Sequence, residues 1–149
     1  MIRLSTGLRN SIAGNDGLGM MMNGGIIRVF SGTQPASPDL DPGSTELARI
    51  TTEGKTFYPV TDPEGAGLIV AVVSPGSLIN DGEWRMKGIA TGTAGWFRWC
   101  WSQVDPLTES SFYPRVDGTI GESFALGNTS ITTGTDVLIG GFQFVIGME

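Results

Sequence analysis

Short runs in which apolar residues alternate with polar ones, or follow one another directly, recur along the chain from residue 26 onward. Turn residues, chiefly Gly, Pro, Asn and Asp, separate these runs. A run of this kind bounded by turn residues is typical of a β-strand. The pattern predicts strands over residues 26–31, 46–52, 55–60, 68–74, 83–87, 95–104, 115–120, 129–132, 136–139 and 142–146.

The order of these elements indicates the fold class. No long helix is predicted between the strands, whereas parallel βαβ units require helices there. A series of short strands separated by turns is typical of an antiparallel sandwich. We therefore expect an all-β fold, an antiparallel β-sandwich or jelly roll, over residues 26–149. The length of 149 residues favours one domain, 1–149, in which residues 1–25 form a short, partly helical N-terminal arm.

Several predicted strands also indicate which side chains face the core. Residues 68–74 form a continuous apolar run, which is typical of a strand buried on both faces. Strict alternation in 83–87 turns Trp84 and Met86 inward and the charged residues outward. In 142–146 one face carries Phe142, Phe144 and Ile146.

The strand over 95–104 is the richest in aromatic residues. One face carries the aromatic residues that we expect to anchor the core, Phe97, Trp99 and Trp101. The opposite face carries Trp96, Arg98, Cys100 and Ser102. Because Trp96 lies away from the predicted core, it is a candidate for surface contacts, although packing against a neighbouring element is the favoured interpretation.

The first 25 residues follow a different pattern, with apolar side chains four residues apart at Leu4, Leu8 and Ile12. This spacing places them on one side of a short helix, with Ser5 or Thr6 as its N-cap. Residues 14–17 interrupt the helix, residues 18–22 form one further turn, and Asn23-Gly24-Gly25 ends it.

This arm carries apolar surface but is too short and too often interrupted to remain helical by itself in water. It must therefore pack on its own sandwich, on a sister subunit or on another partner, and an external partner is our preferred interpretation. The candidate residues for a partner or oligomer interface are Leu4, Leu8, Ile12, Met20, Met21, Met22 and Trp96.

Composition excludes several classes of function. The chain has no His, which removes Ser-His and Cys-His nucleophile pairs and zinc fingers. The net charge of -6 argues against nucleic acid and against a membrane surface as partners. The longest apolar run, 68–73, is too short to span a bilayer, and residues 1–10 do not resemble a secretory signal. We expect synthesis in a cytosol without export by that route.

Two partial motifs point to ligand chemistry, and each has a plainer explanation. Gly54-Lys55-Thr56 matches the end of a phosphate-binding loop, but Arg49 stands where its first glycine belongs, so a hairpin turn is the better interpretation. Asp39, Asp41 and Glu46 match part of a calcium loop, but the spacing fails beyond the second carboxylate. A solvated loop is the better interpretation there.

The remaining candidates for chemistry are equally weak. Cys100 has no His beside it and is predicted to be buried and inert. A carboxylate pair for glycoside hydrolysis would have to be drawn from Asp105, Glu109, Asp117 and Glu122, for which a solvated surface is the default. We therefore expect no enzymatic activity, no cofactor and no metal.

Two central stretches carry a family resemblance: residues 27–37, IRVFSGTQPAS, and residues 90–98, ATGTAGWFR. With the opening LSTGLRN of residues 4–10 and the closing segments 131–135 and 142–144, they make the chain resemble a family of small virion proteins of tailed bacteriophages. The resemblance spans nearly the whole chain. It implies a β-sandwich subunit of a phage particle, made in the cytoplasm of the bacterial host and located in the virion.

Within that family, the resemblance implies a head decoration (cement) protein that binds and stabilises the capsid lattice. The implied partners are the major capsid protein of the same phage and further copies of the chain in a homo-oligomer. A tail or baseplate component is one alternative. A carbohydrate-binding domain of a tail spike is the other, motivated by the four Trp residues and the acidic side chains.

Overall fold

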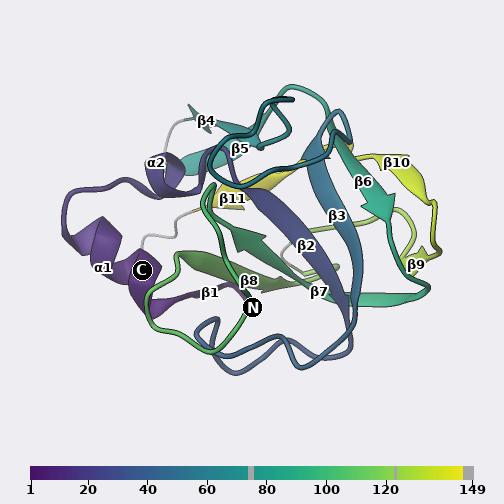
Figure 1. The fold of residues 1–149 in the computed structure, drawn as a ribbon, viewed down its shortest axis with the longest axis horizontal. Helices are drawn as coiled ribbons and strands as arrows, with labels where there is room; N and C mark the ends of the chain where they lie inside the picture. Colours follow the sequence, from purple (N-terminus) through teal and green to yellow (C-terminus); the bar gives the residue numbers. More distant parts are fainter. Residues whose placement is uncertain (74–75, 123, 146–149) are drawn as a thin grey trace.

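The computed structural model of the chain describes residues 1–73, 76–122 and 124–145 (Figure 1). It has an all-β fold of antiparallel sheets with a short helical part near the N-terminus. The strands are β1 (Arg3–Leu4), β2 (Ile26–Ser31), β3 (Glu46–Thr52), β4 (Ile69–Val73), β5 (Ser77–Asp81), β6 (Trp84–Gly88), β7 (Gly92–Cys100), β8 (Arg115–Thr119), β9 (Ser130–Ile131), β10 (Asp136–Leu138) and β11 (Gln143–Val145). The helices are α1 (Thr6–Ala13) and α2 (Leu18–Met22).

The strands form two sheets that share one core. The larger sheet has the order β1-β8-β7-β2-β3-β6-β10, with β9 paired to β7 outside this path, and the smaller one has the order β11-β5-β4. Leu78 of β5 and Phe144 of β11 belong to the same apolar cluster as Ile27 of β2 and Val116 of β8. The two sheets therefore pack as a sandwich, as the turn-separated strands predict.

Strand β7 confirms most of the predicted core assignment and corrects one residue. Phe97 and Trp99 are buried in the central cluster. Trp101 follows the end of β7, is only half-buried and lies outside the central cluster. The apolar run is longer than the strand because the chain leaves the sheet after Cys100.

Strand β6 confirms the alternation in full, because Trp84 and Met86 are buried while Lys87 is exposed. The prediction for 68–74 is half right. A strand does form over Ile69–Val73, but it lies at the edge of the smaller sheet and Val72 is 77% exposed. A continuous apolar run does not distinguish a doubly covered strand from an apolar edge strand, since the covering elements come from elsewhere in the chain.

Other local predictions have mixed outcomes. Glu53 and Gly54 turn the chain with positive φ, as the predicted hairpin requires, but residues 55–60 form no strand, and Val60 has a positive φ of 72° that a strand does not accommodate. The strands β1 and β5 were not predicted. Phe142 and Phe144 are buried as expected, whereas Ser74 and Ile146 lie outside the described residues.

The N-terminal arm packs on its own domain, which corrects our preference for an external partner. Ser5 is the N-cap of α1, since its Oγ accepts a hydrogen bond from the Leu8 backbone N–H. The helix ends at Ala13, but Leu4 precedes it and pairs with Val116 in the sheet. Leu8, Leu18 and Met22 all belong to the central core cluster. An arm of this composition is stabilised by the nearest apolar surface, which is that of its own sandwich.

Candidate interaction surfaces

One register row of the larger sheet is occupied by charged residues on every strand of the main path. The row, here called the charged rung, runs through Arg3, Asp117, Arg98, Arg28, Arg49, Lys87 and Asp136. Its side chains alternate with core residues such as Ile27, Phe97 and Val116, so they lie on the face opposite the core. The rung therefore defines the outer face of the larger sheet.

Carboxylates neutralise the like charges that meet along the rung. Glu46 accepts from Arg28 Nη1 at 3.2 Å and from Arg49 Nε at 2.6 Å. Asp136 accepts from Arg85 Nε at 2.8 Å, and this hydrogen bond lowers the pKa of the Asp136 carboxyl. Ion pairs therefore occupy the exposed half of the outer face.

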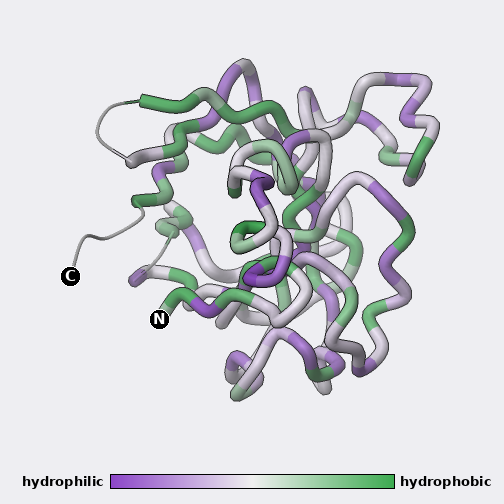
Figure 2. The backbone as a smooth tube through the Cα atoms, turned by 90° about the vertical axis from the view of Figure 1, so that its left-hand side faces the viewer, coloured by the Kyte–Doolittle hydropathy of each residue, from purple (hydrophilic) through white to green (hydrophobic). Residues whose placement is uncertain are grey.

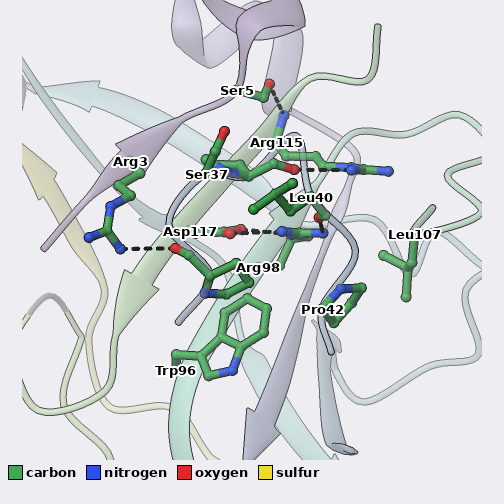
Figure 3. A network of polar contacts seen from close by, with 12 residues as sticks. Arg3, Ser5, Ser37, Leu40, Pro42, Trp96, Arg98, Leu107, Arg115 and Asp117 are labelled. Atoms are coloured by element: carbon green, nitrogen blue, oxygen red, sulfur yellow. Dashed lines mark hydrogen bonds and ion pairs between the residues drawn. The ribbon is translucent and has the colours of Figure 1, made fainter. Parts of the chain in front are cut away.

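The other half of the outer face is covered by the chain's own loop, residues 32–45. Arg98 and Asp117 are fully buried beneath it and form a two-pronged pair, Nε to Oδ1 at 2.7 Å and Nη2 to Oδ2 at 2.8 Å. Figure 3 shows Arg98 between Asp117 and Leu40, with the ring of Trp96 beside it. Arg98 Nη1 also donates to the Leu40 carbonyl at 3.0 Å. The pair thus fastens the loop to the sheet.

Two further arginines bind carbonyl groups of the same loop. Arg3 Nη1 donates to the Pro35 carbonyl at 3.0 Å, and Arg115 Nη1 donates to the Pro38 carbonyl at 3.0 Å. The Asp39 carboxylate accepts from the backbone N–H and from the hydroxyl of Thr6. Asp39, considered above as a calcium ligand, therefore ties the loop to the start of α1.

Arg115 also fixes the neighbouring segment 101–113, here called the aromatic loop. Its guanidinium holds the Asp105 carboxylate through two hydrogen bonds of 2.7 and 2.6 Å and donates to the Thr108 carbonyl at 3.0 Å. It also lies over the Tyr113 ring, 5.1 Å from the ring centre. One buried cation therefore organises a loop that has no strand or helix of its own.

The aromatic loop presents apolar side chains to solvent. The ring centres of Trp101, Phe112 and Tyr113 lie 5.4 to 6.4 Å apart in edge-to-face arrangements. Phe112 is 67% exposed and Val104 is 60% exposed. An exposed aromatic side chain on a preorganised loop is a typical anchor of a protein interface, because little conformational entropy is lost on binding.

A second apolar surface lies at β4. Figure 2 shows this strand as the apolar segment that leads into the upper grey trace, at the periphery of the molecule. Near it, Met20 of α2 is 73% exposed and α2 packs against β4. Within the described residues no strand pairs with the outer edge of β4.

The structure removes several of the predicted interface residues from the surface. Leu8, Met22 and Trp96 are fully buried, and Leu4 and Met21 are partly buried against the core. Trp96 stacks on Phe30 at 4.5 Å between ring centres, and its indole N–H donates to the Ser31 carbonyl at 3.1 Å. It is therefore not available as a platform for sugars. Of the predicted set, Ile12 and Met20 remain exposed.

The candidate reactive groups are also accounted for. Cys100 is buried, and this burial raises the pKa of its thiol to about 12. Asp105 and Asp117 are both held in buried arginine pairs, whereas Glu122 is exposed and pairs with the N-terminal ammonium group. In the described part of the chain, no group of three or more Cys, Asp or Glu side chains is placed to hold a metal ion.

One cleft of about 350 Å³ opens beside β9 and β10, lined by residues such as Leu126, Asn128, Ser130, Thr132 and Val137. Its hydroxyl groups bond locally, as Thr132 and Thr135 do to each other.

Among the residues described, no helix has the length and apolar character needed to cross a membrane. Comparisons with family models, curated proteins and solved structures gave no match to this chain.

Sequence reasoning missed the charged rung and the aromatic loop. Their residues are spread over the whole chain, and only the register of the large sheet brings them together. A local signal existed for the rung, because Arg28, Arg49 and Arg98 each stand between two apolar residues of a predicted strand. That pattern places each arginine opposite the core but does not identify its partner.

Proposed function

We propose that this chain is a non-enzymatic structural subunit of a tailed-phage particle, a head decoration protein that binds the capsid lattice through the aromatic loop. The family resemblance of residues 27–37 and 90–98 supports the virion assignment. The observation that carries the docking surface is Phe112, which is exposed on a loop that Arg115 and Asp105 hold rigid. A lattice-binding protein needs such a preformed contact and gains avidity by repeating it.

The geometry of the aromatic loop also bears on the glycan-binding alternative. Sugar rings stack on an open aromatic face, and neighbouring rings enlarge such a platform only when they are nearly coplanar. Phe112 stands at 80° to Trp101 and at 83° to Tyr113. Rings turned edge to face fit into the irregular pockets of a protein partner better than they cover a flat sugar, so a protein partner is favoured.

The first experiment is the copy number in purified particles of the phage that encodes this chain. For a decoration protein, quantitative mass spectrometry should give a number commensurate with that of the major capsid protein. A handful of copies per particle would instead identify a tail or baseplate component. Absence from particles would refute the virion assignment itself.

The second experiment tests the docking surface with capsids that lack the protein. Phe112→Ser should weaken capsid binding by roughly 30-fold or more per site, because an aromatic anchor contributes about 2 kcal/mol or more. Leu138→Ser, at an apolar position on β10 that is also more than half exposed, is the matched control and should bind as the unmodified protein does. Equal binding by both variants would show that the aromatic loop is not the contact.

A fluorescence titration separates the glycan-binding alternative. Trp101 contacts Phe112 directly, so a glycan bound at the aromatic loop would change Trp emission. Saturable quenching by host lipopolysaccharide, lost in Phe112→Ser, would favour a tail-spike role. We expect no saturable change.

A further inference from the structure

Val60 has a backbone conformation that valine normally avoids. Its φ is 72°, and the Thr61 N–H donates to the Pro59 carbonyl at 2.9 Å, which closes a three-residue γ-turn around it. A γ-turn with a positive φ at its centre is rare and strained, and a side chain branched at Cβ adds to that strain. Val60 is also 63% exposed, so burial in the core does not account for a valine at this position.

Hydrogen bonds explain how the turn is held but not why its central residue is valine. The Val60 N–H donates to the Ser102 carbonyl at 2.9 Å, and the Asp62 carboxylate accepts from the backbone N–H groups of Ala66 and Gly67. The hydrogen bonds of the turn use only backbone atoms of Val60, so glycine or asparagine would permit them with less strain. A strained residue with an exposed side chain is characteristic of a functional site.

The turn lies directly against the aromatic loop. Ser102, whose carbonyl accepts from Val60, follows Trp101, and the Trp101 ring lies 6.0 Å from that of Phe112 between ring centres. Leu107 of the same loop is a second bulky residue with a positive φ, of 62°. Two strained apolar residues therefore lie in adjoining loops, and the exposed apolar surface extends from the aromatic loop to the turn.

We propose that Val60 is a second anchor for the partner that binds the aromatic loop, and that this partner is a protein with an apolar pocket bordered by basic side chains. The inference rests on the proposed function, because the same capsid subunit would cover both anchors. A side chain that the turn holds in place before binding loses little conformational entropy when the partner covers it.

The charge of the two loops indicates the border of the pocket. Residues 58–66 and 101–113 contain no lysine or arginine. Glu64 and Glu109 are exposed there, whereas Asp105 is neutralised by Arg115. Charges across an interface are arranged to complement one another, so a surface that carries only exposed carboxylates favours a partner with lysine or arginine around its pocket.

Val60→Asn tests the second anchor, because it should change stability and binding in opposite directions. Asparagine tolerates a positive φ, so the variant should melt about 2 °C or more above the unmodified protein. Its binding to capsids that lack the protein should weaken about fivefold or more, because an apolar anchor is lost. Val137→Asn, the same change at an exposed valine of β10, is the matched control and should bind within about twofold of the unmodified protein.

Association kinetics at low and high salt test the charge of the partner. Glu109→Gln should slow association with capsids about twofold or more at low salt and make it less dependent on ionic strength. Asp81→Asn removes the same charge at the exposed end of β5 and should leave association nearly unchanged. Faster association at high salt would overturn the basic border of the pocket.

Two results would overturn the role of Val60. One is a Val60→Asn variant that binds capsids as tightly as the unmodified chain while Phe112→Ser binds weakly, and the proposed function would survive that result. The other is a Val60→Asn variant with a lower melting temperature, which would show that the valine is retained for stability. Unchanged binding in both variants would refute the proposed docking surface together with this inference.

Discussion

Replacing Arg98 by methionine tests whether the buried ion pair holds the large sheet and its covering loop together. Methionine keeps most of the side-chain volume but removes the guanidinium, which leaves the buried Asp117 carboxylate without its two hydrogen bonds. The Leu40 carbonyl loses its donor as well. Burial already raises the pKa of the Asp117 carboxyl, and the Arg98 hydrogen bonds act in the opposite direction.

The magnitude follows from the complete burial of both partners. Removing one member of a buried pair costs about 3–5 kcal/mol, against a total stability of roughly 5–15 kcal/mol. In a domain of this size each kcal/mol lowers the melting temperature by about 2–4 °C, so Arg98→Met should lower it by roughly 6–20 °C. The double variant Arg98→Met/Asp117→Val should recover most of this loss, because no buried charge remains unpaired.

Urea and thermal unfolding followed by circular dichroism provide the measurement, with Arg85→Met as the control. Arg85 forms a similar pair with Asp136, but both side chains are partly exposed, so the control should lose less than about 1 kcal/mol. If Arg98→Met lost no more stability than Arg85→Met, or if the double variant were less stable than the single one, the reasoning about the buried pair would be refuted.

Further expectations follow from the core and the arm. Trp99→Ala should cost roughly 3–5 kcal/mol in urea unfolding, because Trp99 is fully buried and packs edge to face on Phe142; an unchanged midpoint would contradict its core position. The Cys100 thiol should not react with a thiol reagent at pH 8 in the native protein and should react fully once unfolded, since burial raises its pKa to about 12; native reactivity would contradict that burial. Deletion of residues 1–16 should lower stability by about 3 kcal/mol or more, because it removes Leu8 from the core; an unchanged unfolding curve would restore the external docking of the arm.

The sequence predicted strands and their buried side chains correctly where turn residues bound a run whose core-facing residues recur at every second position. Residues 26–31 and 46–52 match β2 and β3 at both ends, and the inward positions of Trp84 and Met86 are correct. These elements were predictable because turn residues bound them and because burial of one face follows from period two alone. The strand β5 was missed because Ser77, Asn80 and Asp81 dilute its short apolar pattern.

The candidate site depended on information that a local pattern does not contain. Trp96 was a candidate for surface contacts because it lies opposite the core, and that orientation is correct, but the favoured interpretation, packing against a neighbouring element, is the one that the structure confirms. It is buried because the loop 32–45, which resembles an ordinary solvated loop in sequence, folds back over the outer face. The Arg98 and Asp117 pair likewise arises from the register of β7 and β8, which turn geometry and distant contacts determine.

The closed outer face explains why contacts with other molecules should fall to the aromatic loop. Displacing the loop 32–45 would remove the carbonyl acceptors of Arg3, Arg98 and Arg115, and each such loss carries a desolvation cost.

On a capsid the aromatic loop should make the same contact that it makes with an isolated capsid subunit, because Phe112 is already exposed on a loop held by Arg115. Phe112→Ser should therefore lower the affinity for isolated capsid subunits and the apparent affinity for whole capsids, since both measurements depend on the same anchor. If Phe112→Ser weakened binding to whole capsids and left binding to isolated subunits unchanged, the contact would exist only in the assembled lattice and the assignment of the aromatic loop as the anchor would be wrong.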